Sequence, residues 1–310
     1  MVIEVNNLVK RYKEVLALDH FNLKVEQGEI LGLLGPNGCG KTTAIHSMLS
    51  LLKYDKGDIA LFGRPMSPVA YEVKQEIGLV PQEVAVFEHL TVRENIDYFC
   101  SMYVSDPAKR KDLVDKAIEF VGLEDYVRFF PKKLSGGLKR RLNIACGIAH
   151  QPKLIFLDEP TVAVDAQSRN FILEGIRRLN REGATILYTT HYLEEAEELC
   201  SRIVIMDHGR NVAEGTIDEL KNMIDTKEIV LLEIVNLTPE ARADLEELPN
   251  LSEIESKGDA LVLSFERGSN NLSHLIRFLD DHQLNYQNLY SKQPSLNEVF
   301  LALTGKELRD

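Results

Sequence analysis

Apolar and polar residues alternate along the first 26 residues, and short apolar blocks recur through the next 200. The alternation is typical of half-buried β-strands, and its apolar positions are Val2, Ile3, Val5, Leu16, Leu18, Phe21, Leu23 and Val25. Further short strands are predicted at 58–62, 77–80, 154–157, 184–190, 203–206 and 212–213. Apolar residues spaced by three and four predict helices over 92–103, 109–121 and about 168–181.

This order of elements predicts an α/β fold. Strands that alternate with helices form a mainly parallel sheet with helices on its faces. The helical stretch at about 83–150 interrupts the alternation, so we interpret it as an insertion between two strands. Residues 207–210 are typical of a hairpin-like turn between two of the later strands.

The pattern changes near residue 222, and we expect a domain boundary there, with domains at 1–222 and 223–310. The second part has the order β-α-β-β-α-β and then a further helix, which predicts a small α+β, ferredoxin-like domain. Its expected elements lie at 229–235, 239–248, 251–256, 260–265, 270–282, 286–291 and 295–304. Of the 12 excess negative charges, 8 lie in 225–310, which we interpret as a solvated surface.

Composition narrows the class of protein. A hydrophobic fraction of 44% suits a globular chain. A net charge of −12 argues against a nucleic-acid-binding surface that extends over the whole molecule. The four cysteines lack C-x-x-C spacing, which favours a reducing cytosol. The N-terminus does not resemble a signal peptide, and no apolar run approaches the ~18 residues needed to span a bilayer. We therefore expect any membrane-spanning part to belong to another chain.

The stretch 35–43 fits the phosphate-binding pattern G-x-x-x-x-G-K-[ST] between an apolar strand at 29–34 and a predicted helix at 44–52. Its glycines let backbone N–H groups point into one cavity, and the helix N-terminus adds positive potential. Lys41 brings a charge to the β- and γ-phosphates of a nucleotide, and Thr42 offers a hydroxyl to Mg²⁺. The expected binding residues are Gly35, Pro36, Asn37, Gly38, Cys39, Gly40, Lys41, Thr42 and Thr43.

Two further motifs carry chemistry. The apolar strand 154–157 ends in Asp158 and Glu159, where Asp158 is expected to hold Mg²⁺ and Glu159 to activate the attacking water as general base. Ser135, Gly136 and Gly137 precede a predicted helix and form a second possible anion cradle.

These motifs, taken in order, resemble the ATP-binding subunit of an ABC transporter over residues 1–220. The resemblance adds Gln82 as the Q-loop glutamine, Asp165 as the D-loop aspartate and His191 as the switch histidine, with Tyr12 stacked on adenine. It implies a P-loop NTPase cassette with a mixed β-sheet core, an antiparallel β subdomain and a helical insertion. The implied catalytic residues are Lys41, Gln82, Glu159 and His191, and the implied Mg²⁺ residues are Thr42, Gln82 and Asp158.

The same resemblance implies a mechanism and its partners. ATP would be held between the phosphate loop of one subunit and Ser135–Gly137 of a second in a head-to-tail dimer, most simply a homodimer. Dimer closure would drive a polytopic permease that docks on the insertion 83–150. The chain would then be a peripheral protein on the cytoplasmic face of the membrane, with no nucleic-acid partner.

The chain departs from the family pattern at three positions. Ala163 stands where glycine is usual, Ala166 where proline is usual, and Leu138 where glutamine is usual. A methyl group at position 163 would strain the backbone if φ is positive there. Cys39, near a helix N-terminus, is expected to have a lowered thiol pKa and to be open to alkylation.

The C-terminal tail at 294–305, P-S-L-N-E-V-F-L-A-L-T-G, resembles the endings of bacterial drug-resistance and sodium-export ATPases. The expected cargo is a drug, an antibiotic, a lipid-like compound or an ion. Two alternatives stay open: a soluble ABC ATPase acting on DNA or ribosomes, and a nucleotide-dependent regulatory module that hydrolyses little.

Overall fold

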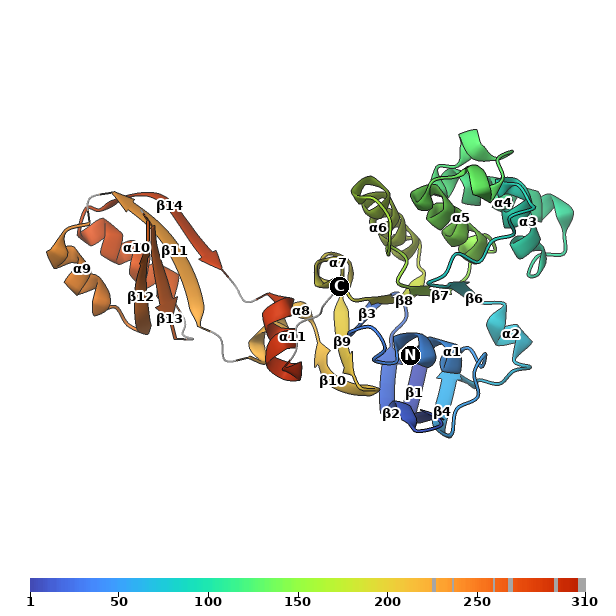
Figure 1. Cartoon of the computed structure of the whole chain (residues 1–310), viewed down its shortest axis with the longest axis horizontal. Coiled ribbons are helices and arrows are strands. Elements are labelled where there is room, and N and C mark those ends of the chain that lie inside the picture. Colours follow the sequence, from blue (N-terminus) through green and yellow to red (C-terminus); the bar gives the residue numbers. More distant parts are fainter. Residues whose placement is uncertain (225–226, 236, 259, 267–269, 293–294, 306–310) are drawn as a thin grey trace. The chain divides into compact units, whose positions relative to one another are not determined.

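The computed structural model describes residues 1–224, 227–235, 237–258, 260–266, 270–292 and 295–305. These residues form two compact units, Met1–Ile217 with the described residues from Leu303 onward, and Asp218–Ala302. Figure 1 labels the elements of both units. Among the described residues, no helix is long and apolar enough to cross a membrane.

A six-stranded sheet forms the centre of the first unit. Five strands run parallel in the order β9-β3-β8-β7-β6, and β10 pairs antiparallel with β9 at the edge. Every residue of β3, β7 and β8 is buried, as expected for parallel strands covered on both faces. The strands are β3 (Ile30–Leu34), β6 (Ile77–Val80), β7 (Leu154–Asp158), β8 (Thr185–Thr190), β9 (Arg202–Asp207) and β10 (Arg210–Gly215).

An antiparallel sheet in the order β2-β1-β4-β5 is the second layer of this unit, as the family resemblance implies. Its strands are β1 (Ile3–Tyr12), β2 (Val15–Val25), β4 (Lys56–Leu61) and β5 (Arg64–Pro65). Helix α1 (Lys41–Met48) begins three residues before the predicted helix, because the left-handed Gly40 is its N-cap. Ala44 and Ile45 of α1 share one hydrophobic core with both sheets, which fixes the loop before the helix.

The insertion at 83–150 carries three α-helices, and Figure 1 shows them gathered beyond the β6 edge of the parallel sheet. They are α3 (Val92–Ser101), α4 (Pro107–Val121) and α5 (Gly136–Ile148). Thr91 and Glu94 form a capping box that starts α3. The remaining helices before the second unit's sheet are α2 (Tyr71–Lys74), η1 (Glu124–Tyr126), η2 (Pro131–Lys133), α6 (Ala166–Arg181), α7 (Leu193–Leu199) and α8 (Ile217–Asn222).

The second unit has the predicted ferredoxin-like arrangement. Its four strands pair antiparallel in the order β12-β13-β11-β14, with helices after β11 and β13. Its core includes Val230, Leu263, Leu275 and Phe278. The elements are β11 (Glu228–Val235), α9 (Pro239–Glu246), β12 (Leu251–Lys257), β13 (Ala260–Phe265), α10 (Asn271–Asp281), β14 (Asn285–Lys292) and α11 (Leu296–Thr304). Pro294, the first residue of the C-terminal motif, lies outside the described residues.

Candidate functional site

The loop between β3 and α1 has the backbone that a phosphate cradle needs. Gly38 and Gly40 have φ values of 79° and 115°, in the left-handed region. A Cβ on Gly40 would lie 2.5 Å from the Ala17 carbonyl oxygen, so only glycine fits there. Asn37 and Gly38 at the tip are exposed, whereas Gly35 and Cys39 are buried. Pro36, Thr42 and Thr43 are half-buried on the same loop, so the predicted phosphate-binding residues lie together.

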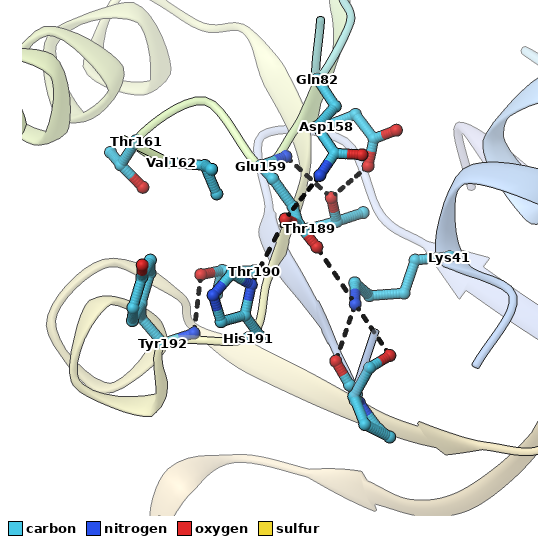
Figure 2. A network of polar contacts seen from close by, with 12 residues as sticks. Lys41, Gln82, Asp158, Glu159, Thr161, Val162, Thr189, Thr190, His191 and Tyr192 are labelled. Atoms are coloured by element: carbon cyan, nitrogen blue, oxygen red, sulfur yellow. Dashed lines mark hydrogen bonds and ion pairs between the residues drawn. The ribbon is translucent and has the colours of Figure 1, made fainter. Parts of the chain in front are cut away.

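Lys41 lies at the centre of this loop with only 5% of its side chain exposed. Its Nζ donates hydrogen bonds to the carbonyl oxygens of Gly35, at 2.7 Å, and Pro36, at 3.2 Å. It also forms an ion pair with Glu159 Oε1 at 3.2 Å (Figure 2). The lysine charge is therefore held between the loop and the carboxylate at the end of β7.

Glu159 contacts the three other predicted catalytic residues, of which Lys41 is described above. Its Oε2 accepts a hydrogen bond from Gln82 Nε2 at 3.0 Å and lies 3.3 Å from His191 Nδ1 (Figure 2). The Glu159 side chain is 5% exposed and the backbone has a positive φ of 46°. Positive φ in a non-glycine residue is strained and is typical of functional sites. Residues 41, 82, 159 and 191 thus form one cluster, as the sequence predicts.

Asp158 has a different set of partners, although it is the adjacent residue. Its Oδ2 accepts a hydrogen bond from Thr42 Oγ1 at 2.8 Å, and its Oδ1 accepts one from Thr189 Oγ1 at 2.6 Å. A carboxylate beside a hydroxyl is the kind of oxygen pair that Mg²⁺ prefers. No group of three or more His, Cys, Asp or Glu side chains suited to a metal is found in the described part of the chain. A Mg²⁺ ion here would therefore need phosphate and water oxygens to complete its ligands.

Ser135, Gly136, Gly137 and Asp165 form a second group, at the N-termini of α5 and α6. Ser135 Oγ caps α5 by accepting a hydrogen bond from Leu138 N at 3.3 Å. Asp165 caps α6 and bonds to both the backbone and the hydroxyl of Ser168, each at 2.8 Å. Ser135, Gly136 and Asp165 are exposed. The two helix N-termini lie side by side, because a Cβ on Gly137 would lie 3.0 Å from Asp165 Oδ2.

Tyr12 is the last residue of β1, and 45% of its surface is exposed. Lys10 Nζ lies 4.9 Å from the centroid of its ring. The ring is thus accessible for stacking.

The prediction for the Cys39 thiol was wrong. Cys39 is 4% exposed, and burial raises its pKa, although Lys41 lowers it in part. Desolvation of the thiolate therefore outweighs the positive potential of the helix N-terminus.

The concern about Ala163 is confirmed. Ala163 has a φ of 59°, so its methyl group sits in a backbone conformation that favours glycine. Ala166 is the first residue of α6, directly after the Asp165 cap, a position where proline is well tolerated.

Three residues that the sequence analysis missed, Thr189, Arg140 and Asn143, form hydrogen bonds with the site segments. Thr189 pairs with Asp158 in the register of β7 and β8, and its hydroxyl also accepts a hydrogen bond from Glu159 N at 3.0 Å. From α5, Arg140 donates to the Gln82 carbonyl oxygen at 2.7 Å, and Asn143 donates to that of Pro81 at 3.1 Å. Burial lowers the pKa of Arg140, an effect that Glu159 and Asp158 oppose. Polar residues three apart on a buried helix face are the signal that could have identified this pair.

Comparisons with known proteins agree with this geometry. Residues 18–162 match the family model described as ABC transporter, and residues 215–304 match that of the DrrA1-3-like ATP-binding protein C-terminal domain. The chain is 35% identical over 314 residues to the linearmycin resistance ATP-binding protein LnrL of Bacillus subtilis (strain 168), covering 100% of both. It is 38% identical over 303 residues to the daunorubicin resistance ATP-binding protein DrrA2 of Streptomyces coeruleorubidus, covering 96% of this chain and 92% of that protein.

A solved structure similar to this chain is the dimeric post-hydrolysis state of the ATP-binding cassette MJ0796 bound to ADP and Pi. The TM-score is 0.64 and the identity 26%, covering 69% of this chain and 98% of that one. This chain belongs to the ABC transporter family, as an ATP-binding and ATP-hydrolysing subunit of the branch that includes the drug-resistance proteins.

Proposed function

We propose that this chain hydrolyses ATP to power the export of a substrate through a separate membrane permease. The observation that carries the proposal is the Glu159 carboxylate, which Lys41, Gln82 and His191 contact from three distant parts of the chain. The names of the relatives, resistance proteins for linearmycin and daunorubicin, support a drug-like or antibiotic cargo.

Each residue of the cluster has a role in this proposal. Lys41 moves its charge from Glu159 to the β- and γ-phosphates when ATP enters the loop. Glu159 is then free to accept a proton from the attacking water. His191 holds the γ-phosphate, and Gln82 reports its presence to the insertion 83–150, where the permease docks.

Mg²⁺ would be held by Thr42, Asp158 and Gln82. Thr42 is hydrogen-bonded to Asp158, and Gln82 to the adjacent carboxylate of Glu159. Bound there, the ion would neutralise charge that develops on the phosphates. The remaining phosphate contacts come from backbone N–H groups of 35–43, and Tyr12 supplies the stacking face for adenine.

The second group of residues serves a second copy of the chain. Ser135, Gly136, Gly137 and Asp165 contact the ATP held by a partner subunit in a head-to-tail homodimer. The exposure of Ser135, Gly136 and Asp165 supports this role, because a residue that acts across an interface must be accessible in the single chain. We further propose that 1–222 and 223–310 are separate domains, and that the protein lies on the cytoplasmic face of the membrane against its permease.

Co-purification from membranes tests the proposal, using Glu159→Gln with Mg-ATP. The variant retains the loop that binds ATP but lacks the base, so we expect a stable ATP-bound dimer with a polytopic membrane protein in stoichiometric amount. Wild-type hydrolysis by Glu159→Gln would overturn the role of Glu159. Recovery of DNA or ribosomes, or of the chain alone, would favour the cytosolic ATPase or the regulatory module instead.

A further inference from the structure

Glu195 is an acidic side chain that is fully buried, at 0% exposure, and to which the mechanism above gives no role. It lies in α7, four residues after His191. Burying an ionised carboxylate costs several kcal/mol unless it is paired and hydrogen-bonded. The partners of Glu195 must therefore offset this cost.

Glu195 contacts four polar side chains. Its Oε2 accepts hydrogen bonds from Tyr188 Oη at 2.6 Å, Thr161 Oγ1 at 2.9 Å and Thr190 Oγ1 at 3.0 Å. Its Oε1 lies 2.8 Å from Arg169 Nε, without the alignment of a hydrogen bond. The three hydroxyl-bearing partners are at most 4% exposed, so water does not compete for these contacts.

Three of these partners belong to segments that carry proposed site residues, namely Glu159, His191 and Asp165. Thr161 follows Glu159 by two residues, and Thr190 immediately precedes His191. Thr190 Oγ1 also accepts a hydrogen bond from Tyr192 N at 2.9 Å, which fixes the turn around His191 (Figure 2). Arg169 lies on α6, one turn after the Asp165 cap.

We propose that Glu195 is a positioning residue that ties the Glu159, His191 and Asp165 segments into one unit. The inference rests on the proposed roles of those three residues. Loss of any one partner would leave a buried polar group unpaired, so the segments are favoured to move together rather than singly. A movement of the His191 segment on nucleotide binding is thereby transmitted to the general base Glu159 through the Glu195 carboxylate. The same holds for a movement of the Asp165 segment when it contacts a second subunit.

Glu195→Gln in the full-length chain tests this inference. The amide oxygen can still accept from the three hydroxyls, but the negative charge that pairs with Arg169 is lost and an NH2 group replaces Oε1 beside Arg169 Nε. We therefore expect kcat for ATP hydrolysis to fall about tenfold, and at most ~100-fold, because small misplacements of reacting groups have effects of this size. Mg-ADP affinity, measured by calorimetry on the same chain, should stay within about twofold, since the phosphate loop is not in this network. Thr161→Val removes one hydroxyl at constant shape and should lower kcat in the same direction.

Glu29→Gln is the matched control. Glu29 Oε1 also lies 2.8 Å from an arginine Nε, that of Arg202, and the other hydrogen bond of the Glu29 carboxylate to a different residue comes from Glu26 N. Its kcat should equal that of the wild type. The inference would be overturned if Glu195→Gln lowers Mg-ADP affinity by the same factor as kcat and also lowers the melting temperature, because this would be a general loss of structure. It would also be overturned if kcat is unchanged in both Glu195→Gln and Thr161→Val.

His191→Ala separates this failure from a failure of the proposed function. If Glu195→Gln and Thr161→Val hydrolyse ATP normally while His191→Ala does not, the positioning role alone is overturned. Normal hydrolysis in all three variants overturns the role of His191 and the inference together.

Discussion

Lys41 Nζ and Glu159 Oε1 lie 3.2 Å apart, and each of the two side chains is 5% exposed. The cation proposed to meet phosphate and the carboxylate proposed to accept a proton thus pair with each other. Because a buried ion that loses its partner is costly, the proposed mechanism requires ATP to replace Glu159 as the partner of Lys41. In that mechanism the general base becomes free only when its substrate is present.

This pairing predicts coupled effects on stability. Lys41→Met and Glu159→Gln should each lower the free energy of unfolding, and the double variant should lose less than the two single losses together, by roughly 1–3 kcal/mol. Urea denaturation of the nucleotide-free proteins would measure the cycle. Additive losses would mean that the two side chains do not interact in solution.

Gly137 and Gly136 should respond differently to alanine, although they are neighbours. A Cβ on Gly137 would lie 2.2 Å from Ser168 Oγ, whereas one on Gly136 has its nearest neighbour at 3.8 Å. We expect Gly137→Ala to lower the free energy of unfolding by about 1–3 kcal/mol through overpacking. Gly136→Ala, the control, should be neutral or slightly stabilising, because alanine favours the helix. Equal melting temperatures for the two variants would contradict this geometry.

Ala163→Gly should stabilise the protein. The left-handed backbone costs an L-residue about 1–2 kcal/mol, and glycine loses roughly 0.4–1 kcal/mol more in chain entropy on folding. The net gain expected is about 0.5–1 kcal/mol, seen as a higher midpoint in urea. Ala163→Val, with its branched side chain, should shift the midpoint the other way, and a lower midpoint for the glycine variant would show that φ at 163 is not positive.

His150 should make stability depend on pH. Burial lowers the pKa of His150 to about 4, while its ring stacks on Tyr103. Since the unfolded imidazole titrates near 6.5, the unfolded state binds the proton first as pH falls, and stability drops between pH 6.5 and pH 4. The loss is at most about 3 kcal/mol.

The measurement is the free energy of unfolding from pH 7 to pH 4 for wild type and His150→Gln, which should have a flatter profile. The exposed His89→Gln serves as the control and should follow the wild type. Parallel profiles for wild type and His150→Gln would rule out a buried neutral imidazole at this position.

Native Cys39 should react slowly with thiol reagents. All four cysteines are buried, and burial raises the pKa of each. A disulfide reagent at pH 8 should therefore titrate almost no thiol until guanidinium unfolds the chain, when four should react. Fast reaction of one thiol per native chain, absent in the Cys39→Ser variant, would contradict the burial of this thiol.

Local features of the fold could be predicted from the amino-acid sequence. Alternation and three-to-four spacing predicted the strands and helices, because burial on one face follows directly from the period of each element. The Gly35–Thr42 spacing predicted the phosphate loop for a similar reason, since left-handed glycines and a helix N-terminus are properties of contiguous residues. The ferredoxin-like order of the second unit was also correct, because short connections leave few topologies.

Contacts between residues that are distant in the sequence became known from the folded chain. Thr189 lies beside Asp158 because β7 and β8 pair in one particular register, and Arg140 reaches the Gln82 carbonyl because α5 packs on the Q-loop. The sequence pattern contains neither the register nor the packing. The buried state of Cys39 and the partners of Glu195 have the same origin, since desolvation and pairing depend on every element that surrounds a side chain.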